Sequence, residues 1–172
     1  MGRGNIVLRG ALVALSSMTQ ADQTKFCVWL QSDELRSLID DPRQPGLEDQ
    51  MKWFKRVQQP DRKFFSLVSV PDGVLIGNCG FVDIDTARQE ATLRITIGNP
   101  DYVGQGLGTE AVQLLVGYGF GTMSLKHILL KVVATNVRAI RTYEKAGFTK
   151  ASEETKEGKT IVTMSLMKPA RV

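Results

Sequence analysis

The sequence predicts a mixed α/β (α+β) domain whose central sheet is mostly antiparallel and locally parallel. Two observations point to this class. Residues 63–98 contain three successive strand patterns with short turns between them, as expected for an antiparallel meander. Residues 99–148 then alternate between a glycine-rich turn, helix patterns and a buried strand, which is typical of strands joined by a helical crossover. The whole chain predicts about seven strands and about four helices.

The amino-terminal part predicts a strand over residues 5–9, a helix that begins near Thr19, and a second helix over residues 47–57. The apolar run ALVAL at residues 11–15 is too short for the hydrophobic segment of a signal peptide. Nothing in the chain is long and apolar enough to span a bilayer. A length of 172 residues, without an internal repeat or a linker, predicts a single domain over residues 1–172.

The rest of the chain predicts the meander, followed by a helix, a strand, a short helix and a final hairpin. Alternation in the third meander strand places Arg94 on its polar face. Gly147 stands where a glycine commonly ends a helix. The strands are expected at residues 63–70, 74–85, 90–98, 127–134, 148–154 and 160–167, and the helices at 109–122 and 135–147.

Composition limits the kinds of partner. Cys27 and Cys79 each lie in an apolar stretch, which predicts buried thiols in the reducing cytoplasm and not a disulfide framework. With one histidine, His127, and no cluster of cysteine and histidine, we expect no metal site. The net charge of +4 suits an anionic ligand, but the basic residues are scattered, which argues against a nucleic-acid-binding protein.

The sequence VGQGLGTEA at residues 103–111 opens a predicted helix with three glycines. It fails the Walker A pattern because position 108 is glycine, and the dinucleotide pattern because position 109 is threonine. A glycine-rich turn before a helix still exposes backbone N–H groups in a positive potential, which favours a phosphate. A tight turn without any ligand is the alternative.

Two blocks of the sequence resemble the GNAT superfamily of acetyl-CoA-dependent N-acetyltransferases. VGQGLG resembles the family's Gln/Arg-x-x-Gly-x-Gly/Ala loop, and residues 136–148 resemble its Asn-x-x-Ala-x-x-x-Tyr-x-x-x-Gly-Phe block. Within the superfamily, residues 108–120 and 136–148 are most similar in sequence to the branch of ribosomal-protein N-terminal, spermidine and amino-sugar acetyltransferases. One departure is Val103, which stands where the family usually has glutamine or arginine.

The resemblance implies the GNAT fold, with two splayed parallel strands at a site for acetyl-CoA as co-substrate. The loop would hold the coenzyme's pyrophosphate mostly through backbone amides, so the loss of a side chain at Val103 is expected to be tolerated. The coenzyme-binding residues implied are Ile97, Val103, Gly104, Gln105, Gly106, Leu107, Gly108, Thr109, Asn136, Arg138, Ala139 and Tyr143.

Tyr143 would act as the general acid that gives a proton to the departing thiolate, as the resemblance implies. A phenol with an ordinary pKa of about 10 still carries its proton at neutral pH. Asn136 lies two helical turns before it, on the same helix face. A core aromatic residue at helical spacing is the alternative for Tyr143. Arg138, Arg141 and Lys145 would either meet the coenzyme's 3′-phosphate or face water.

A general base is needed because an alkylammonium group must lose a proton before it attacks. Glu90 is the candidate that we carry forward, with Asp83 and Asp85 as weaker ones, although each also fits a solvated charge at the end of a hairpin. His127 is expected to be structural. Cys79 as a nucleophile is disfavoured because no histidine is placed to activate it.

The expected reaction is direct acetyl transfer to a primary amine: a polyamine, an amino sugar, an aminoglycoside or a protein N-terminus. Asp33, Glu34, Asp40 and Asp41 would attract a polycation, or form an ordinary acidic loop. An acetyl-CoA-binding regulatory module without turnover is the alternative function. We expect no membrane partner, and we keep a homodimer open as the assembly.

Three aromatic residues near the amino terminus are expected to pack in the core, with an acceptor groove as the alternative. They are Trp29, Trp53 and Phe54.

Overall fold

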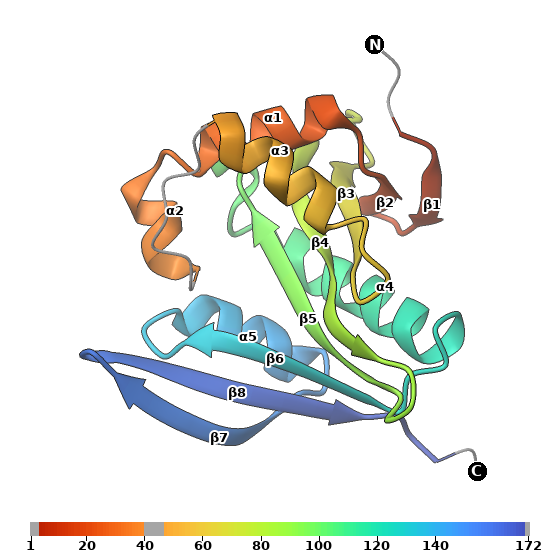
Figure 1. Ribbon diagram of the computed structural model, residues 1–172, viewed down its shortest axis with the longest axis vertical. Helices are drawn as coiled ribbons and strands as arrows, with labels where there is room; N and C mark the ends of the chain where they lie inside the picture. The colour runs from red at the N-terminus through yellow and green to blue at the C-terminus, as the bar shows by residue number, and fades with distance from the viewer. Residues whose placement is uncertain (1–3, 40–46, 171–172) are drawn as a thin grey trace.

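The computed structural model describes residues 4–39 and 47–170. Within them it contains eight strands, five α-helices and one short 3-10 helix (Figure 1). The helices are α1 Gln20–Trp29, α2 Asp33–Leu38, α3 Leu47–Arg56, η1 Pro100–Tyr102, α4 Leu107–Gly121 and α5 Val137–Lys145. The strands are β1 Ile6–Arg9, β2 Val13–Ser17, β3 Lys63–Ser69, β4 Leu75–Asp85, β5 Glu90–Ile97, β6 His127–Val133, β7 Thr149–Lys156 and β8 Lys159–Met167.

The strands form one sheet in the order β1-β2-β3-β4-β5-β6-β8-β7. Neighbouring strands are antiparallel except β5 and β6, which run parallel and are connected through α4. The predicted mixed α/β fold and its parallel pair are thereby confirmed. No helix in the described part of the chain is long and apolar enough to cross a membrane.

Besides the short 3-10 helix η1, one strand and one α-helix were not expected from the sequence. Strand β2 has four buried residues in succession, so its sequence lacks the alternation that indicates a half-buried strand. Helix α2 has only six residues, too few for a helical period to be visible. It begins where the Ser32 hydroxyl accepts a hydrogen bond from the backbone N–H of Leu35 at 3.3 Å.

Local signals explain where the longer helices begin and end. At the start of α1, the Thr19 hydroxyl accepts from the backbone N–H of Asp22 at 3.2 Å, and the Asp22 carboxylate accepts from that of Thr19 at 2.9 Å. This reciprocal pair satisfies two N–H groups that the helix leaves without partners. After α5, Gly147 adopts a φ of +98°, the left-handed conformation that its position in the sequence predicts.

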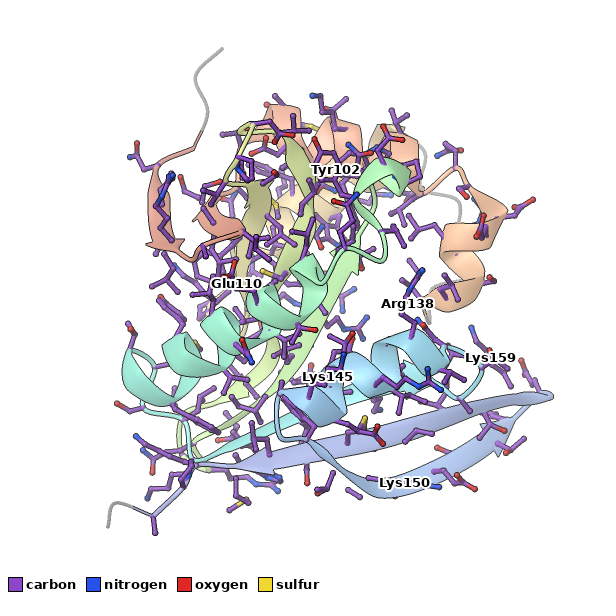
Figure 2. The ribbon with its side chains drawn as sticks, turned by 180° about the vertical axis from the view of Figure 1, so that it is seen from behind. Tyr102, Glu110, Arg138, Lys145, Lys150 and Lys159 are labelled. Carbon is purple, nitrogen blue, oxygen red and sulfur yellow. The ribbon has the colours of Figure 1, made fainter. Side chains whose placement is uncertain are left out.

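Helices cover both faces of the sheet. Phe65 of β3 packs edge-on against Tyr118 of α4 at 5.2 Å between ring centroids. Its neighbour Phe64, on the opposite face, packs against Trp53 of α3 at 5.4 Å. Helices α4 and α5 therefore lie on one face, the α4–α5 face (Figure 2), and α1 and α3 lie on the other, the α1–α3 face (Figure 1).

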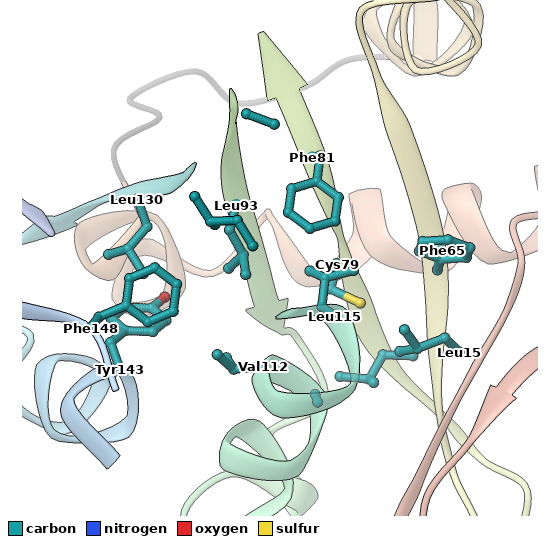
Figure 3. Packing of buried hydrophobic residues seen from close by; sticks show 14 of the residues in the cluster. Leu15, Phe65, Cys79, Phe81, Leu93, Val112, Leu115, Leu130, Tyr143 and Phe148 are labelled. Atoms are coloured by element: carbon teal, nitrogen blue, oxygen red, sulfur yellow. The ribbon is translucent and has the colours of Figure 1, made fainter. Parts of the chain in front are cut away.

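The main core lies between the sheet and α4 (Figure 3). Phe81, Leu115 and Ile128 are fully buried there, and each such side chain contributes about 1.5–3 kcal/mol of transfer free energy. Gly119 of α4 faces them, because a Cβ atom at this position would lie 2.9 Å from the ring of Phe81. A close helix–sheet approach thus accounts for Gly119, whereas nothing lies within 4 Å of a Cβ at Gly117.

Both cysteines are free and buried, as predicted. Burial raises the pKa of each thiol, and most strongly that of Cys79, which is fully enclosed in the core. A thiol that is protonated and inaccessible cannot act as a nucleophile. The weak alternative of a covalent mechanism through Cys79 therefore has no support in the structure.

Candidate functional site

The parallel strands β5 and β6 separate soon after they begin. Their pairing ends at Thr92 and Leu129, although β5 continues to Ile97 and β6 to Val133. A cavity of about 750 Å³ fills the space between the diverging strands. It is bounded by the glycine loop (residues 103–108) and α5 on one side, and by α1 and α2 on the other.

The backbone of β5 offers hydrogen-bonding groups to this cavity. The N–H of Gly98, directly after β5, donates to the carbonyl of Ile76 in β4 at 2.9 Å. Because successive residues of a strand direct their N–H groups to opposite sides, those of Ile95 and Ile97 point away from β4 and into the gap. Both residues line the cavity, beyond the end of the β5–β6 pairing.

The glycine loop at the mouth of the cavity requires its glycines. Gly104 and Gly106 have φ angles of +82° and +77°, which side chains strongly disfavour. Gly106 is the N-cap residue of α4 and supplies no side-chain hydrogen bond to the helix start. The N–H groups of Leu107 and Gly108 at the start of α4 precede the first intrahelical partner. The loop thus presents amide groups and the positive end of a helix to the cavity, an arrangement suited to an anion.

The other loop residues differ in what they can offer. Val103 lines the cavity with an apolar side chain. Gln105 is turned back onto its own loop, where its amide donates to the carbonyl of Asp101 at 2.6 Å. Leu107 is buried in the core and anchors the first turn of α4. A Cβ at Gly108 would be in ordinary contact with Ile97 at 3.6 Å, so an alanine would fit there.

Asn136 is the N-cap residue of α5. Its carbonyl oxygen accepts from the backbone N–H of Ala139 at 3.2 Å, and its Nδ2 donates to the carbonyl of Leu38 at 3.3 Å. The side chain therefore joins the start of α5 to the end of α2, across the cavity that all three residues line. One N–H of the amide group remains for a ligand.

Tyr143 lies on α5 beside the cavity and is 8% exposed. Its ring packs edge-on against Phe148 at 6.2 Å (Figure 3). Burial raises the pKa of Tyr143 to about 12, so the phenol keeps its proton throughout the neutral range. Tyr143 therefore packs in the core, as the alternative expected, and also lines the cavity, while its role as general acid stays a prediction.

Basic side chains follow the cavity-facing side of α5. Arg138, Arg141 and Lys145 recur every three or four residues, are exposed and line the cavity. Figure 2 shows Arg138 and Lys145 at opposite ends of the helix, with Arg138 toward α2. Together with the glycine loop they give this half of the cavity, which we call the loop side, a positive character.

The opposite half, which we call the α1–α2 side, has an apolar wall contributed by α1 and α2. Trp29 lines it and packs so closely against the end of β5 that a Cβ at Gly98 would lie 2.4 Å from its ring. Glu34 of α2 is the carboxylate that lines this half among the described residues. The apolar residues that complete the wall are Val28, Leu35, Leu38 and Ile39.

Two cations also line the α1–α2 side. Arg94 of β5 and Lys131 of β6 lie two residues beyond the last strand pair, at equivalent positions on the same face of the sheet. That face is the α1–α3 face, because Thr96 lies on it opposite Asn78 and Ser66. Alternation in the sequence indicated the face of Arg94 but no ligand, and nothing in the sequence pointed to Lys131.

The structure does not bring Glu90 to the cavity. It is the first residue of β5, where its carboxylate lies 3.1 Å from the guanidinium of Arg88 and 3.6 Å from Nδ1 of His127. Seven strand residues at about 3.3 Å each place it about 23 Å from Ile97 at the other end of the strand. The proposed role of Glu90 as general base therefore lacks the proximity that proton transfer requires.

Asp83 and Asp85 lie at the same distant end, in the β4–β5 hairpin. Asp85 accepts a hydrogen bond from the backbone N–H of Arg88 at 2.9 Å, as expected for a residue that stabilises a turn. Asp83 has a positive φ of 52° at the irregular end of β4. Neither lines the cavity, so both fit the solvated charges that the sequence allowed.

The predicted acidic and aromatic clusters divide between different places. Glu34 lines the cavity, whereas Asp33 forms an ion pair with Arg36, and Asp40 and Asp41 lie outside the described residues. Trp53 packs between Phe26 and Phe64, on the α1–α3 face of the sheet. Phe54 borders a second, smaller hollow beside β3. Of the three aromatic residues considered for an acceptor groove, the structure brings only Trp29 to the main cavity.

Sequence reasoning missed Glu110, in the first turn of α4. Its carboxylate accepts from the backbone N–H groups of Ala11, Leu12 and Val13 at 2.9, 2.7 and 2.7 Å. This contact joins the turn between β1 and β2 to the helix that the glycine loop opens (Figure 2). No local signal could have shown it, since the partners are about a hundred residues apart in the chain.

Comparison with known proteins agrees with this geometry. Residues 13–149 match the acetyltransferase (GNAT) domain family. The spermidine N(1)-acetyltransferase of Escherichia coli strain K12 is 32% identical over 120 residues, which are 69% of this chain and 62% of that protein. The matched region thus spans about three fifths of the length of this curated relative.

Solved structures share the fold. The spermidine N-acetyltransferase of Vibrio cholerae, crystallised with CoA and spermine, superimposes with a TM-score of 0.84 over 92% of this chain and 96% of that one, at 17% identity. An aminoglycoside acetyltransferase in complex with coenzyme A gives 0.75 over 91% and 95%, at 24% identity. At such identities the likeness concerns the fold alone. The match over residues 13–149 and the shared fold establish that this chain belongs to the GNAT acetyltransferase family.

Proposed function

We propose that the chain is an N-acetyltransferase that moves the acetyl group of acetyl-CoA directly to a primary amine. The observation that carries the proposal is the glycine loop with its uncapped helix start, at the mouth of a cavity between splayed parallel strands. The named relatives are N-acetyltransferases and match over part of their length, so their activity supports the proposal by likeness.

The loop side fits acetyl-CoA. Amides from Gly104 to Thr109 would bind the pyrophosphate, and the N–H groups of Ile95 and Ile97 would bind the pantetheine arm as a neighbouring strand would. Val103 removes a side-chain contact but no backbone donor. Arg138, with Arg141 and Lys145 on the same helix, would attract the remaining phosphate charge.

Asn136 and Ala139 shape the path of the arm along α5. Asn136 would give its free N–H to the coenzyme, and its contact with Leu38 would keep α2 close to the bound arm. Ala139 is small enough to leave room beside the helix. Both roles rest on the positions of these residues in the cavity wall and on the resemblance of residues 136–148 to the family's block.

Tyr143 would be the general acid. The acceptor nitrogen forms a bond to the acetyl carbon, the carbon–sulfur bond breaks, and sulfur takes a proton that the Tyr143 hydroxyl would supply. The raised pKa of Tyr143 keeps that proton in place before reaction. N–H groups of β5 would stabilise the negative charge on the acetyl oxygen.

Glu34 replaces Glu90 as our candidate for the base. It lines the α1–α2 side of the cavity, on the face from which an acceptor would approach, and would take a proton from the acceptor ammonium directly or through water.

We also propose that the chain forms a single domain and that it is located in the cytoplasm. One domain is supported by the single sheet, and a cytoplasmic site by the two free cysteines. A homodimer and the absence of a nucleic-acid partner stay predictions.

The test measures release of free thiol from acetyl-CoA in the presence of polyamines, amino sugars, aminoglycosides and peptides with a free N-terminus. We expect release that depends on the amine and on Tyr143. Acetyl-CoA binding without release would favour a coenzyme-binding module that lacks turnover. If neither binding nor release is found, the proposal is wrong.

A further inference from the structure

We infer that the acceptor is a primary amine that also carries an anionic group, a carboxylate or a phosphate, and that Arg94 and Lys131 bind this group. The inference rests on the proposed function and narrows it. It concerns the α1–α2 side of the cavity, from which the acceptor would reach the acetyl group.

The positions of the two cations carry the inference. The last pair of the β5–β6 ladder is Thr92 and Leu129, so Arg94 and Lys131 would face each other if the strands had stayed paired. Both are exposed and line the cavity just beyond the point where the strands diverge. Two like charges on the same face of adjacent, diverging strands repel each other, and an anion bound between them would be attracted to both.

Neither cation is neutralised by a neighbour within the described residues, where the ion pairs involve other side chains. Within the described part of the cavity wall, Glu34 is the carboxylate of this half, on α2 and not on the strands. An acceptor could therefore place its ammonium group near Glu34 and its anionic group between the strands. Thr92 and Thr96 flank Arg94 on the same strand face and add hydroxyl groups to the site.

The same charges argue against a polycation. A polyamine or an aminoglycoside carries several ammonium groups and needs several carboxylates to balance them. Here two cations oppose one carboxylate on the α1–α2 side of the described cavity wall, and Asp33 is already paired with Arg36. The apolar wall around Trp29 instead favours an acceptor with an apolar substituent, such as an amino acid with a hydrophobic side chain.

Matched acceptors test the inference by thiol release. Phenylalanine is compared with phenylalaninamide and phenethylamine for the carboxylate, and glucosamine 6-phosphate with glucosamine for the phosphate. Spermidine and kanamycin serve as polycations. We expect kcat/KM to be at least about tenfold higher for one acceptor with an anionic group than for its partner without that group, as for a charge-assisted contact.

Variants show whether the two cations cause the preference. Arg94→Gln and Lys131→Gln should each remove most of it, because kcat/KM should fall for the acceptor with the anionic group and not for its partner without that group, while acetyl-CoA affinity stays within about twofold. Lys126→Gln is the matched control, because Lys126 is also exposed but lies just before the other end of β6. A merely structural role would lower turnover of acceptors with and without the anionic group alike.

The outcomes separate this inference from the proposed function. Turnover that favours spermidine or kanamycin, or a preference unchanged in both variants, overturns the inference and leaves the acetyltransferase standing. If acetyl-CoA binds but no acceptor reacts, calorimetry measures the binding of the same amines to the CoA-loaded protein and to its Arg94→Gln variant. Binding of an anionic amine that Arg94→Gln weakens supports the inference, and any other result contradicts it. Failure of acetyl-CoA itself to bind rejects the proposed function.

Discussion

The two sides of the cavity differ in how they are built. The loop side comes from one continuous stretch of chain, from the end of β5 to the end of α5, and much of its chemistry lies in the backbone. The α1–α2 side is assembled from α1, α2 and the residues of β5 and β6 on the α1–α3 face of the sheet, and its chemistry lies in side chains. A backbone conformation such as that of the glycine loop requires particular residues within a short stretch of sequence. Side chains that come together from distant segments leave no such local pattern.

This difference explains what each side would do. A loop of backbone amides binds any ligand with the right phosphate geometry, so it suits a co-substrate that many proteins share. A wall of side chains can change by substitution without altering the fold, so it suits the selection of an acceptor. A substitution on one side of the cavity should therefore leave the function of the other side intact.

The largest effect is expected for Tyr143→Phe. Removal of the general acid should lower kcat by about 100-fold or more, because the thiolate loses its proton donor. Acetyl-CoA affinity should change by less than about twofold, because the ring and its packing against Phe148 remain. Steady-state thiol release and calorimetry on the same preparation measure both. An unchanged kcat would remove Tyr143 from the mechanism and leave it a core residue.

The contrast also explains what could be predicted from the sequence. The meander, the parallel pair and the glycine loop were predictable because turn residues and hydrophobic period mark them locally. Asn136 and Tyr143 belong to one continuous helical segment, so the sequence showed that they share a helix face. The resemblance added that this face borders the same site as the glycine loop, and both residues do line the cavity.

The failures have a common cause. Glu90 begins the strand whose other end lines the cavity, and the sequence does not show which end of a strand meets the site. Helix α2, with Glu34, is too short to show a period. Lys131 and the contacts of Glu110 depend on strands and turns that meet only after folding.

The next prediction concerns pH and Tyr143. Burial raises the pKa of Tyr143 to about 12, above the value of about 10 in an unfolded chain. Between these values the unfolded chain has released the proton and the folded chain keeps it, so the free energy of unfolding falls as pH rises from about 10 to 12.

The loss should reach about 2–3 kcal/mol by the upper end of that window, and it should be absent below about pH 9. Denaturant unfolding of the native chain and of Tyr143→Phe is measured across this pH range. The difference between the two proteins gives the contribution of Tyr143 to the loss, since lysines and other tyrosines titrate in both. Parallel stability curves for the two proteins would show that the phenol is not held neutral by burial.

A smaller effect on both stability and binding is expected for Glu110→Gln. The carboxylate accepts from three backbone N–H groups, whereas a glutamine offers one oxygen and places an NH₂ group against the others. We expect a loss of about 1–2 kcal/mol in the free energy of unfolding, together with weaker acetyl-CoA binding because the start of α4 is less fixed.

The control for this variant is Glu144→Gln, on the exposed surface of α5, which should change neither quantity. Equal stability of Glu110→Gln and the native chain would mean that the contact with the β1–β2 turn does not hold the helix start.

The smallest effect is expected for Lys145→Gln. An exposed cation at some distance from the pyrophosphate should contribute about threefold to acetyl-CoA affinity, and salt should reduce the difference further. Lys150→Gln on β7 removes the same charge away from the cavity (Figure 2) and should leave affinity unchanged. Equal losses in the two variants would indicate general attraction of an anion and not a contact on the loop side.

The central claim is that backbone amides of the glycine loop hold the coenzyme's pyrophosphate. Calorimetric titration of acetyl-CoA into the native chain, Gly106→Ala and Gly158→Ala tests it most directly. The two glycines have nearly equal φ angles, +77° and +78°, and open space around a Cβ, so alanine brings the same strain to each. We predict binding to the native chain and to Gly158→Ala with similar affinity, and binding at least about tenfold weaker to Gly106→Ala. No binding to the native chain, or equal affinity in all three proteins, would contradict the claim.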